Sequence, residues 1–347
     1  MDEKNLSSSG IPSPRRKWIA ILLVALVVAI GIWLVSSKRD VARTNAPLTT
    51  SIGIATWPGF APAFIAKERG FFKNLNVSVN VLDDFTARQA AFVSGKTDFT
   101  IYTIDSLAFD AGKGLDGKIV MILDRSNGAD GIVARAGIRA ISDLKGKKVA
   151  YTRGSPAHFL LFTALSKAGL QLSDIETVEV DDPTRAAEAF LAGSVDAAVT
   201  WEPYLSQIVK SRKGVVLGDT RTIDDRIIDV LVARNEVIAE HPEIVQAVVS
   251  GWMQALDEVA HPKADTFAIM AKGLGMPEAD FRGGAAGVAF ADRAMNAQWL
   301  VPVSSGQSKA SLLFDDAAKL WQIAGFGKPP KVGVSYVTDN FVRALPN

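Results

Sequence analysis

The 347-residue sequence contains no cysteine, which excludes disulfide bonds, thiolate metal sites, thiol nucleophiles and a lipid-modified N-terminal cysteine. Histidine is nearly as scarce, and His158, His241 and His261 do not show the spacing typical of metal ligands. Acidic and basic residues almost cancel, with 37 Asp and Glu against 38 Lys and Arg, and no basic block follows residue 50. We therefore expect no metal site, no cofactor and no nucleic-acid partner.

The rest of the composition is that of an ordinary globular protein. Apolar residues make up 48 % of the chain and charged residues 22 %. The chain is longer than one average domain, and its length suits two lobes of ordinary size.

An uncharged apolar run, Trp18–Val35, precedes this globular part. As a helix its 18 residues would measure about 27 Å, close to the roughly 30 Å hydrocarbon core of a membrane. The basic residues 15–17 come directly before the run, which favours an N-terminus inside the cell and a body outside. We therefore predict a single-pass protein of the inner membrane with its body in the periplasm: a cytoplasmic tail at 1–17, a transmembrane helix or signal segment at 18–37 and a linker at 38–48.

Two alternatives to a retained anchor stay open. The apolar run could be the core of a cleaved signal peptide, which would release the body into the periplasm; however, it is longer than the usual core, and Ser36–Arg39 is a poor cleavage site. Arg15 and Arg16 could instead belong to a twin-arginine export signal.

An internal repeat organises the globular part. Residues 83–98, DDFTARQAAFVSGKTD, align without a gap to residues 181–196, DDPTRAAEAFLAGSVD, and seven of the 16 positions are identical. The shared Phe–x–x–Gly–x–x–Asp is typical of a structural role, with Phe in the core, Gly ending a helix and Asp opening a turn. The duplication predicts two similar lobes that face each other.

Each half reads strand–helix–strand–helix–strand, which indicates parallel α/β sheets. The expected strands are 52–56, 77–82 and 99–102 in the first half, and 148–151, 177–180 and 197–200 in the second. After residue 225 the pattern changes to a strand at 227–233 and then to amphipathic helices, in which Trp252 falls on the apolar face. We expect these helices to pack on the first lobe.

In open parallel sheets, ligands bind beyond the carboxyl ends of the strands, and this rule nominates four places. The first, Thr56–Phe60, holds Trp57 in a Pro–Gly turn, where a ring can form a stacking wall. The second, Arg153–His158, holds Ser155 before a proline. Such a helix start either offers free N–H groups to an anion or is an ordinary helix cap.

The third place is a pair of segments that the 98-residue offset makes equivalent. Thr103–Asp105 and Trp201–Pro203 each follow the third strand of their half, and Trp201 and Glu202 should lie at a strand end. The fourth place, Asp124–Gly131, is rich in polar residues and glycine, so it is either a simple turn or a ligand loop.

These segments resemble the solute-binding proteins of nitrate, sulfonate and taurine ABC transporters, a family that includes thiamine-pyrimidine binders. The carriers of the resemblance are WPGFAPAFIAKERGFF, SNGADGIVA, DLKGKKVAYTRGSPAHFLLFTALSKAGL and VDAAVTWEPYLS, in that order, within residues 50–260. Most family members have a cleaved signal peptide or a lipidated cysteine, and this chain departs from that pattern.

The resemblance implies an α/β, type II periplasmic-binding-protein fold with two βαβ lobes joined by two hinge strands. Lobe I would comprise 49–136 and 228–347, lobe II would comprise 137–227, and the hinges would fall near Ala134–Ile138 and Asp225–Asp229. The family's cleft would map to Trp57, Thr103, Ser126, Asp130, Ser155, His158, Trp201, Glu202 and Asp229.

We therefore expect the solute-binding component of an ABC importer, closing by a hinge on a small polar organic molecule of the sulfonate, taurine or nitrate class. Ser155 and adjacent N–H groups would hold an anionic group, the two tryptophans would sandwich the body, and the acidic residues would receive an amine or ring N–H. The partners would be a permease and, through it, an ATPase.

Two other binding roles stay open, a membrane-tethered sensor subunit and a binder of a hydroxymethylpyrimidine-type thiamine precursor. We do not expect an enzyme, because related enzymes on this fold rely on iron, histidine and cysteine features that the sequence does not support.

Overall fold

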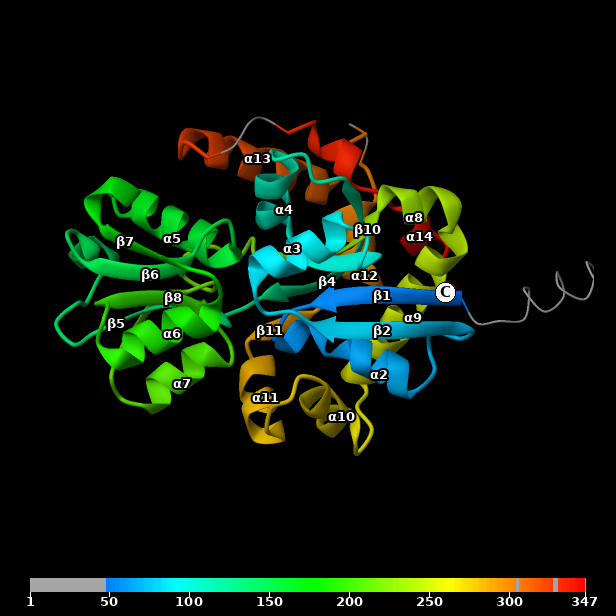
Figure 1. Cartoon of the computed structure of the whole chain (residues 1–347), viewed down its shortest axis with the longest axis horizontal. Helices are drawn as coiled ribbons and strands as arrows, with labels where there is room; N and C mark the ends of the chain where they lie inside the picture. Colours follow the sequence, from blue (N-terminus) through cyan, green and yellow to red (C-terminus); the bar gives the residue numbers. More distant parts are fainter. Residues whose placement is uncertain (1–47, 304–305, 327–329, 347) are drawn as a thin grey trace, which may run out of the picture. The chain divides into compact units, whose positions relative to one another are not determined.

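The computed structural model describes residues 48–303, 306–326 and 330–346 (Figure 1). The predicted cytoplasmic tail and the predicted transmembrane or signal segment at 18–37 lie outside these residues. Within the described ranges, no helix combines the length and the apolar character that crossing a membrane requires.

The first sheet has six strands in the order β11-β4-β10-β3-β1-β2. In chain order these are β1 (Leu48–Ile54), β2 (Leu75–Val81), β3 (Phe99–Thr103), β4 (Gly117–Ser126), β10 (Ile228–Arg234) and β11 (Val288–Phe290). The helices between its early strands are α2 (Pro62–Glu68), α3 (Phe85–Val93) and α4 (Ile104–Ala111), with the short 3-10 turn η1 (Pro58–Phe60) before α2.

The second sheet has five strands in the order β7-β6-β8-β5-β9. These are β5 (Asp130–Ala134), β6 (Lys148–Thr152), β7 (Glu176–Val180), β8 (Ala197–Trp201) and β9 (Val215–Asp219). Figure 1 shows α5 (Pro156–Lys167) over one face of this sheet and α6 (Pro183–Ala192) and α7 (Tyr204–Lys210) over the other. The 3-10 turns η2 (Ile141–Leu144) and η3 (Leu172–Asp174) lie in its loops.

The predicted duplication is confirmed in the topology. Each half places its first strand in the middle, giving β3-β1-β2 and β8-β6-β7, and the pairs β1–β3, β6–β7 and β6–β8 are parallel. The repeated aspartates have equivalent roles, because Asp98 accepts a hydrogen bond from the backbone N–H of Ser51 and Asp196 accepts one from that of Lys148. The repeated phenylalanines are buried at 1 % and 0 % exposure. The repeated motif is therefore structural, as its composition indicates.

The chain crosses between the sheets twice, and the first crossing corrects an expectation. The first hinge is expected at Ala134–Ile138, but β5 pairs with β8 and β9 in the second sheet, so the chain crosses at 127–129. Hydrogen bonds hold the two crossings together: the hydroxyl of Ser126, at the end of β4, bonds that of Thr220 at 2.9 Å, on the return crossing at 220–227. The backbone N–H of Ser126 also donates to the carbonyl of Ile227 at 3.0 Å.

The C-terminal helices pack on the first sheet, as expected from their amphipathic pattern. They are α8 (Asn235–Glu240), α9 (Pro242–Ala260), α10 (Thr266–Gly273), α11 (Glu278–Ala285), α12 (Arg293–Leu300), α13 (Lys309–Ile323) and α14 (Asn340–Arg343), with the turn η4 (Gly333–Tyr336). Helix α9 packs on α2, α13 packs on α4, and α12 and α14 contact β4. Trp252 of α9 is fully buried, so its predicted core position is confirmed.

One side chain of these helices completes the hydrogen bonding of β4. Asn296 of α12, 1 % exposed, accepts a hydrogen bond from the N–H of Ile122 at 2.8 Å and donates to its carbonyl at 3.0 Å. An amide side chain can satisfy both groups at once, which an aliphatic residue of the same size cannot do.

We expect Asn296→Leu to lower the free energy of unfolding by about 2–4 kcal/mol, because it leaves one buried donor and one buried acceptor without partners. Denaturant unfolding monitored by circular dichroism measures the change. Gln298→Leu, at an exposed position on the same helix, is the matched control and should change stability by no more than about 0.5 kcal/mol. Equal stability of the two variants would contradict the assigned role.

Candidate functional site

A cavity lies where the strands of the two sheets end. Five of the candidate residues line it, and they come from both sheets: Trp57, Thr103, Asp130, Trp201 and Asp229. Its free space is about 30 Å³, room for roughly two water molecules. All five side chains are buried, with exposed fractions of 3–7 %.

Strand ends and strand pairing bring these residues together. Trp57 follows β1, Thr103 ends β3 and Trp201 ends β8, so the cavity lies at the carboxyl ends of strands, where parallel sheets usually bind ligands. Asp130 opens β5 and is paired with Trp201 across the sheet. Asp229 lies on β10, paired with Thr103 on one side.

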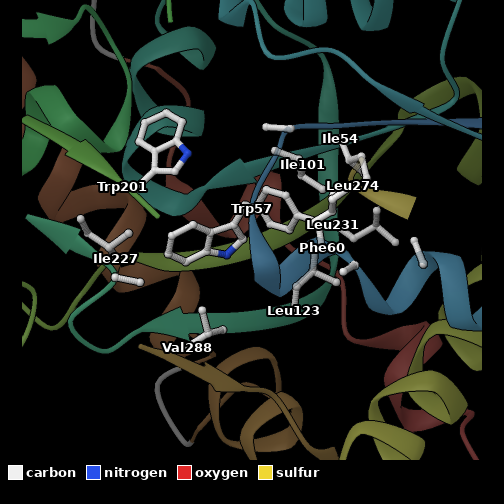
Figure 2. Packing of buried hydrophobic residues seen from close by; sticks show 14 of the residues in the cluster. Ile54, Trp57, Phe60, Ile101, Leu123, Trp201, Ile227, Leu231, Leu274 and Val288 are labelled. Carbon is white, nitrogen blue, oxygen red and sulfur yellow. The ribbon is translucent and has the colours of Figure 1, made fainter. Parts of the chain in front are cut away.

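The indole of Trp57 is held in place by a buried carboxylate. Its Nε1–H donates to the Oδ1 and Oδ2 of Asp124, at 3.1 and 3.3 Å, and Asp124 is fully buried. Position 59, two residues after Trp57, accepts only glycine, because a Cβ there would come within 1.9 Å of the Asp124 carboxylate. The Pro–Gly turn therefore positions the ring as one wall of the cavity (Figure 2).

Trp201 contributes a second ring and an unused hydrogen-bond donor. Figure 2 shows its indole on the side of the cavity that belongs to the second sheet. Its Nε1–H is buried and has no partner among the described residues. Buried N–H groups nearly always have partners, so this donor is available to a molecule bound in the cavity.

Arg88, which is not among the residues predicted from the sequence, also lines the cavity. Its guanidinium is 5 % exposed, lies 5.2 Å from the ring centre of Phe85 and donates to the carbonyl of Leu82 at 2.5 Å. Burial lowers its pKa from the ordinary value, but a guanidinium remains charged in proteins. One signal for Arg88 is visible in the sequence. In the alignment of the two repeats, Arg88 of the first copy is equivalent to Ala186 of the second, so a charged residue stands where the other copy has a small apolar one.

Carboxyl groups are concentrated around the cavity, and the described residues pair none of the four below with a cation. Burial raises the pKa of Asp130, and that of Asp105, two residues after Thr103, to about 7. Both carboxylate oxygens of Asp105 are buried, with no partner in the described part of the chain. Burial also raises the pKa values of Asp124 and Asp229. The neighbouring Asp124 carboxyl raises the pKa of Asp229 further. Asp105 and Asp124 fall in nominated segments but were not named as candidates.

Two candidate serines do not line the cavity. Ser126 belongs to the first crossing, where its hydroxyl also accepts a hydrogen bond from the backbone N–H of Asp130 at 3.2 Å. Ser155 stands at the N-cap position of α5, but its side chain does not cap the helix, because its hydroxyl donates to the carbonyl of Thr152 at 2.6 Å. Its neighbour Pro156 lines the cavity instead, so the N-terminal end of α5 lies at the site.

His158 and Glu202 lie outside the lining as well. Burial is the main reason why the pKa of His158 falls to about 3, and its Nδ1 accepts a hydrogen bond from the N–H of Gly154. The ring packs within 5.0 Å of the Trp321 ring, centre to centre. The carboxylate of Glu202 accepts hydrogen bonds from the N–H and the hydroxyl of Ser206, and burial raises its pKa. Both side chains support the walls of the site.

Comparisons with known proteins agree with this geometry. The family model described as NMT1/THI5 like matches residues 57–265. A Brucella abortus (strain 2308) protein named "Putative binding protein" is 30 % identical over 217 residues, which cover 60 % of this chain and 66 % of that protein. The chain thus spans just under two thirds of the length of this relative.

Two further relatives are matched over more of their length. A Bacillus subtilis (strain 168) protein named as an aliphatic sulfonates-binding protein is 31 % identical over 261 residues, 69 % of this chain and 76 % of that one. The taurine-binding periplasmic protein of Escherichia coli (strain K12) is 25 % identical over 309 residues, 84 % of this chain and 93 % of that one.

Solved structures show the same fold. The alkanesulfonate-binding protein SsuA from Xanthomonas axonopodis pv. citri, bound to MOPS, has a TM-score of 0.70 at 21 % identity, covering 83 % of this chain and 98 % of that one. The desulfurization enzyme DSZB has a TM-score of 0.61 at 16 % identity, covering 85 % and 98 %. The expected α/β periplasmic-binding fold is confirmed. Through the matching family model and the identity to the Bacillus subtilis protein, this chain belongs to the NMT1/THI5-like family, as its sequence motifs indicated.

Proposed function

We propose that the protein is the extracytoplasmic solute-binding component of an ABC importer, and that its solute is a small organic molecule bearing both a sulfonate-like anion and an amino group. The observation that carries this proposal is the mixed chemistry of one buried cavity, in which Arg88 and the free indole N–H of Trp201 accompany the carboxyls of Asp130 and Asp229. The sulfonate- and taurine-binding names of the relatives support the same class.

The anionic end of the solute has three groups to meet. Within the described residues, Arg88 donates one hydrogen bond, to the carbonyl of Leu82, so most of its five N–H donors remain for a ligand. Trp201 adds its indole N–H, and the N-terminal end of α5 adds positive partial charge beside Pro156. A guanidinium suits an anion with several oxygens, because it can donate two parallel hydrogen bonds.

The amino end has two carboxyls to meet. Asp130 and Asp229 line the cavity, and neither forms an ion pair with a Lys, Arg or His of the described chain. An ammonium group would satisfy their negative charge, whereas a purely inorganic anion such as nitrate would leave it unpaired.

Entry of a solute requires the cavity walls to move apart. About 30 Å³ of free space is too small for an organic molecule, and residues of both sheets form the walls. The two crossings at 127–129 and 220–227 are short and lie side by side. Such a pair of connections suits a hinge between two lobes, one built on the first sheet and the other on the second. Opening and closing about these crossings is the binding motion that we propose.

The place of the protein in the cell follows from the same proposal. A solute-binding component works outside the membrane, delivering its ligand to a permease that an ATPase drives. The apolar run at 18–35, preceded by basic residues, would hold the body on the outer side as a single-pass anchor. Protease protection in spheroplasts with an N-terminal and a C-terminal epitope tests this arrangement.

A second candidate solute is an aminopyrimidine. It is favoured by the aromatic walls, since Phe60, Phe85 and Tyr102 line the cavity together with the two tryptophans, and a planar ring stacks well against such surfaces. Its amino group would still be received by Asp130 or Asp229. A thermal-shift screen that includes sulfonates, aminosulfonates, nitrate and pyrimidines separates the two classes, because a ligand of the folded state raises the melting temperature.

We expect Trp201→Phe to weaken binding of the solute found in that screen by about tenfold or more, because it keeps an aromatic wall but removes one donor to a charged group. Isothermal titration calorimetry measures the loss. Trp252→Phe is the matched control, since the Nε1–H of Trp252 is likewise buried without a partner in the described chain but lies away from the cavity. A similar loss in both variants would contradict the assignment.

Arg88→Met should abolish measurable binding of sulfonates, because it replaces the guanidinium by an apolar chain of similar length. Arg135→Met serves as control, since Arg135 also lies over a phenylalanine ring, at 4.8 Å from Phe190, and donates to backbone carbonyls outside the cavity. Titration calorimetry should show binding lost in the first variant only. Retained sulfonate binding in Arg88→Met would remove this residue from the site.

The ligand-free protein should lose stability as the pH rises from about 5 to about 8. The pKa values of Asp105 and Asp130 are raised to about 7, so the folded state binds their protons more tightly than the unfolded state does. Their contribution to stability is therefore fully present below the ordinary Asp pKa of about 4 and is lost as the pH rises through about 7. Thermal unfolding across this range measures the effect. Asp130→Asn should flatten the profile, and an unchanged profile would show that this carboxyl ionises normally.

A further inference from the structure

Asp229, which lines the cavity, lies directly opposite a second carboxyl, Asp124, on the adjacent strand. Asp229 of β10 and Asp124 of β4 are paired in the antiparallel register, which brings the two Cβ atoms to about 5 Å. Asp124 is 0 % and Asp229 5 % exposed, and in the part of the chain that the structure describes neither forms an ion pair. Two ionised carboxylates so close and so poorly solvated repel strongly, so the pair is stable only with one proton between them.

The surrounding hydrogen bonds decide which carboxyl carries that proton. Asp124 accepts hydrogen bonds from the Nε1–H of Trp57 with both oxygens, which favours its ionised form. Among the residues that the structure describes, Asp229 receives no such donor, and its side chain lines the cavity. Burial and the neighbouring Asp124 together raise the pKa of Asp229 well above its ordinary value. The proton therefore resides on Asp229, which donates it to Asp124.

The other charged groups around this pair keep the proton in place. Asp105 and Asp130 add negative potential that raises the pKa of Asp229 further, and Glu202 acts similarly on Asp130. Arg88 is the cation that lines the same cavity, and its recorded hydrogen bond is to a backbone carbonyl rather than to a carboxylate. The site therefore holds an excess of acids, and a cation can enter by replacing a proton.

We propose that one proton bridges Asp229 and Asp124 in the ligand-free site, and that the cationic nitrogen of the solute takes its place. The exchange is balanced: the O–H bond of Asp229 breaks, the proton leaves to solvent, and the ammonium N–H groups donate to the carboxylate that remains. No covalent bond to the solute forms. This inference rests on the proposed function, because it requires a solute in this cavity.

The exchange defines the ligand class more narrowly than size does. A cationic nitrogen pairs with the carboxylate that forms when the proton departs. A methyl group of the same size does not displace the proton and makes no favourable electrostatic contact with the carboxyls. The affinity for an aminosulfonate should therefore increase as the pH rises through neutrality, until the amine itself loses its proton. The affinity for a simple sulfonate should not increase.

Titration calorimetry of the full chain with taurine and with propane-1-sulfonate tests the exchange, because these probes differ in the group at one end and match in length. At about pH 8, Asp130 is largely ionised, so release reports mainly on Asp229. The dependence of the binding enthalpy on the buffer's ionisation enthalpy counts the protons. We expect taurine to release about one proton. We expect propane-1-sulfonate to release none and to bind at least about tenfold more weakly.

Asp229→Asn removes the exchange. Taurine should then bind at least about 30-fold more weakly and release no proton, because the carboxylate that receives the ammonium is gone. Asp265→Asn is the matched control, since Asp265 is an exposed partner of Arg69 far from the cavity lining, and it should bind taurine like the natural chain. Taurine binding without proton release in the unsubstituted protein would overturn the inference.

Infrared spectroscopy of the ligand-free protein tests the shared proton without any ligand. At about pH 8 the carboxylic-acid carbonyl band should be strong in the unsubstituted chain and in Asp265→Asn, and much weaker in Asp229→Asn. The same band in all three proteins would overturn the shared proton while leaving the proposed function intact. If the band behaves as expected but neither sulfonate binds, the proposed solute class and the exchange fail, and the shared proton stands.

Discussion

The site depends on the two short crossings that run beside each other between the sheets. The hydrogen bonds from Ser126 to Thr220 and Ile227 tie the first crossing to the second, so the end of β4 and the beginnings of β5 and β10 meet at one place. This arrangement brings Asp229 from one sheet and Asp130 from the other into a single cavity. A binding site assembled across such a boundary is complete only when both sides are present, which is the physical basis of binding by closure.

The cavity is costly to fold. Several carboxyls are buried there without partner cations, and an unpaired buried charge is among the more destabilising features that a protein can contain. The pKa values raised by burial show that the protein meets part of this cost by keeping protons on the acids. Under the proposed function, a cationic ligand would relieve this cost, so binding and stability would be linked at this place.

The two repeated halves have the same arrangement of strands and helices, but they place different side chains at the cavity. Equivalent positions of the two halves face the same cavity with different groups, because Thr103 in the first half corresponds to Trp201 in the second. Likewise Arg88 has Ala186 as its equivalent, which is buried in the core. Asp98 and Asp196 stayed structural, since each accepts a hydrogen bond from a backbone N–H of the neighbouring strand, and Phe92 and Phe190 fill the core beside the two sheets.

The sequence alone determined the duplication and the parallel strands of each half, because the period of apolar residues and the turn residues are local properties. It did not predict β4, β5, β9 and β11 as strands, and both sheets are mixed, because β10 and β5 pair with their neighbours in the antiparallel direction. It also nominated Trp57, Trp201 and Asp130, since aromatic and polar residues near strand ends are visible in the sequence, whereas Asp229 was expected only from the family resemblance. Only the tertiary structure decided the crossing at 127–129, which depends on the pairing of β5 with β8 and β9. It likewise revealed Arg88, whose position depends on how α3 packs, and the pairing of Asp229 with Asp124, since cross-strand register joins residues that are far apart in sequence.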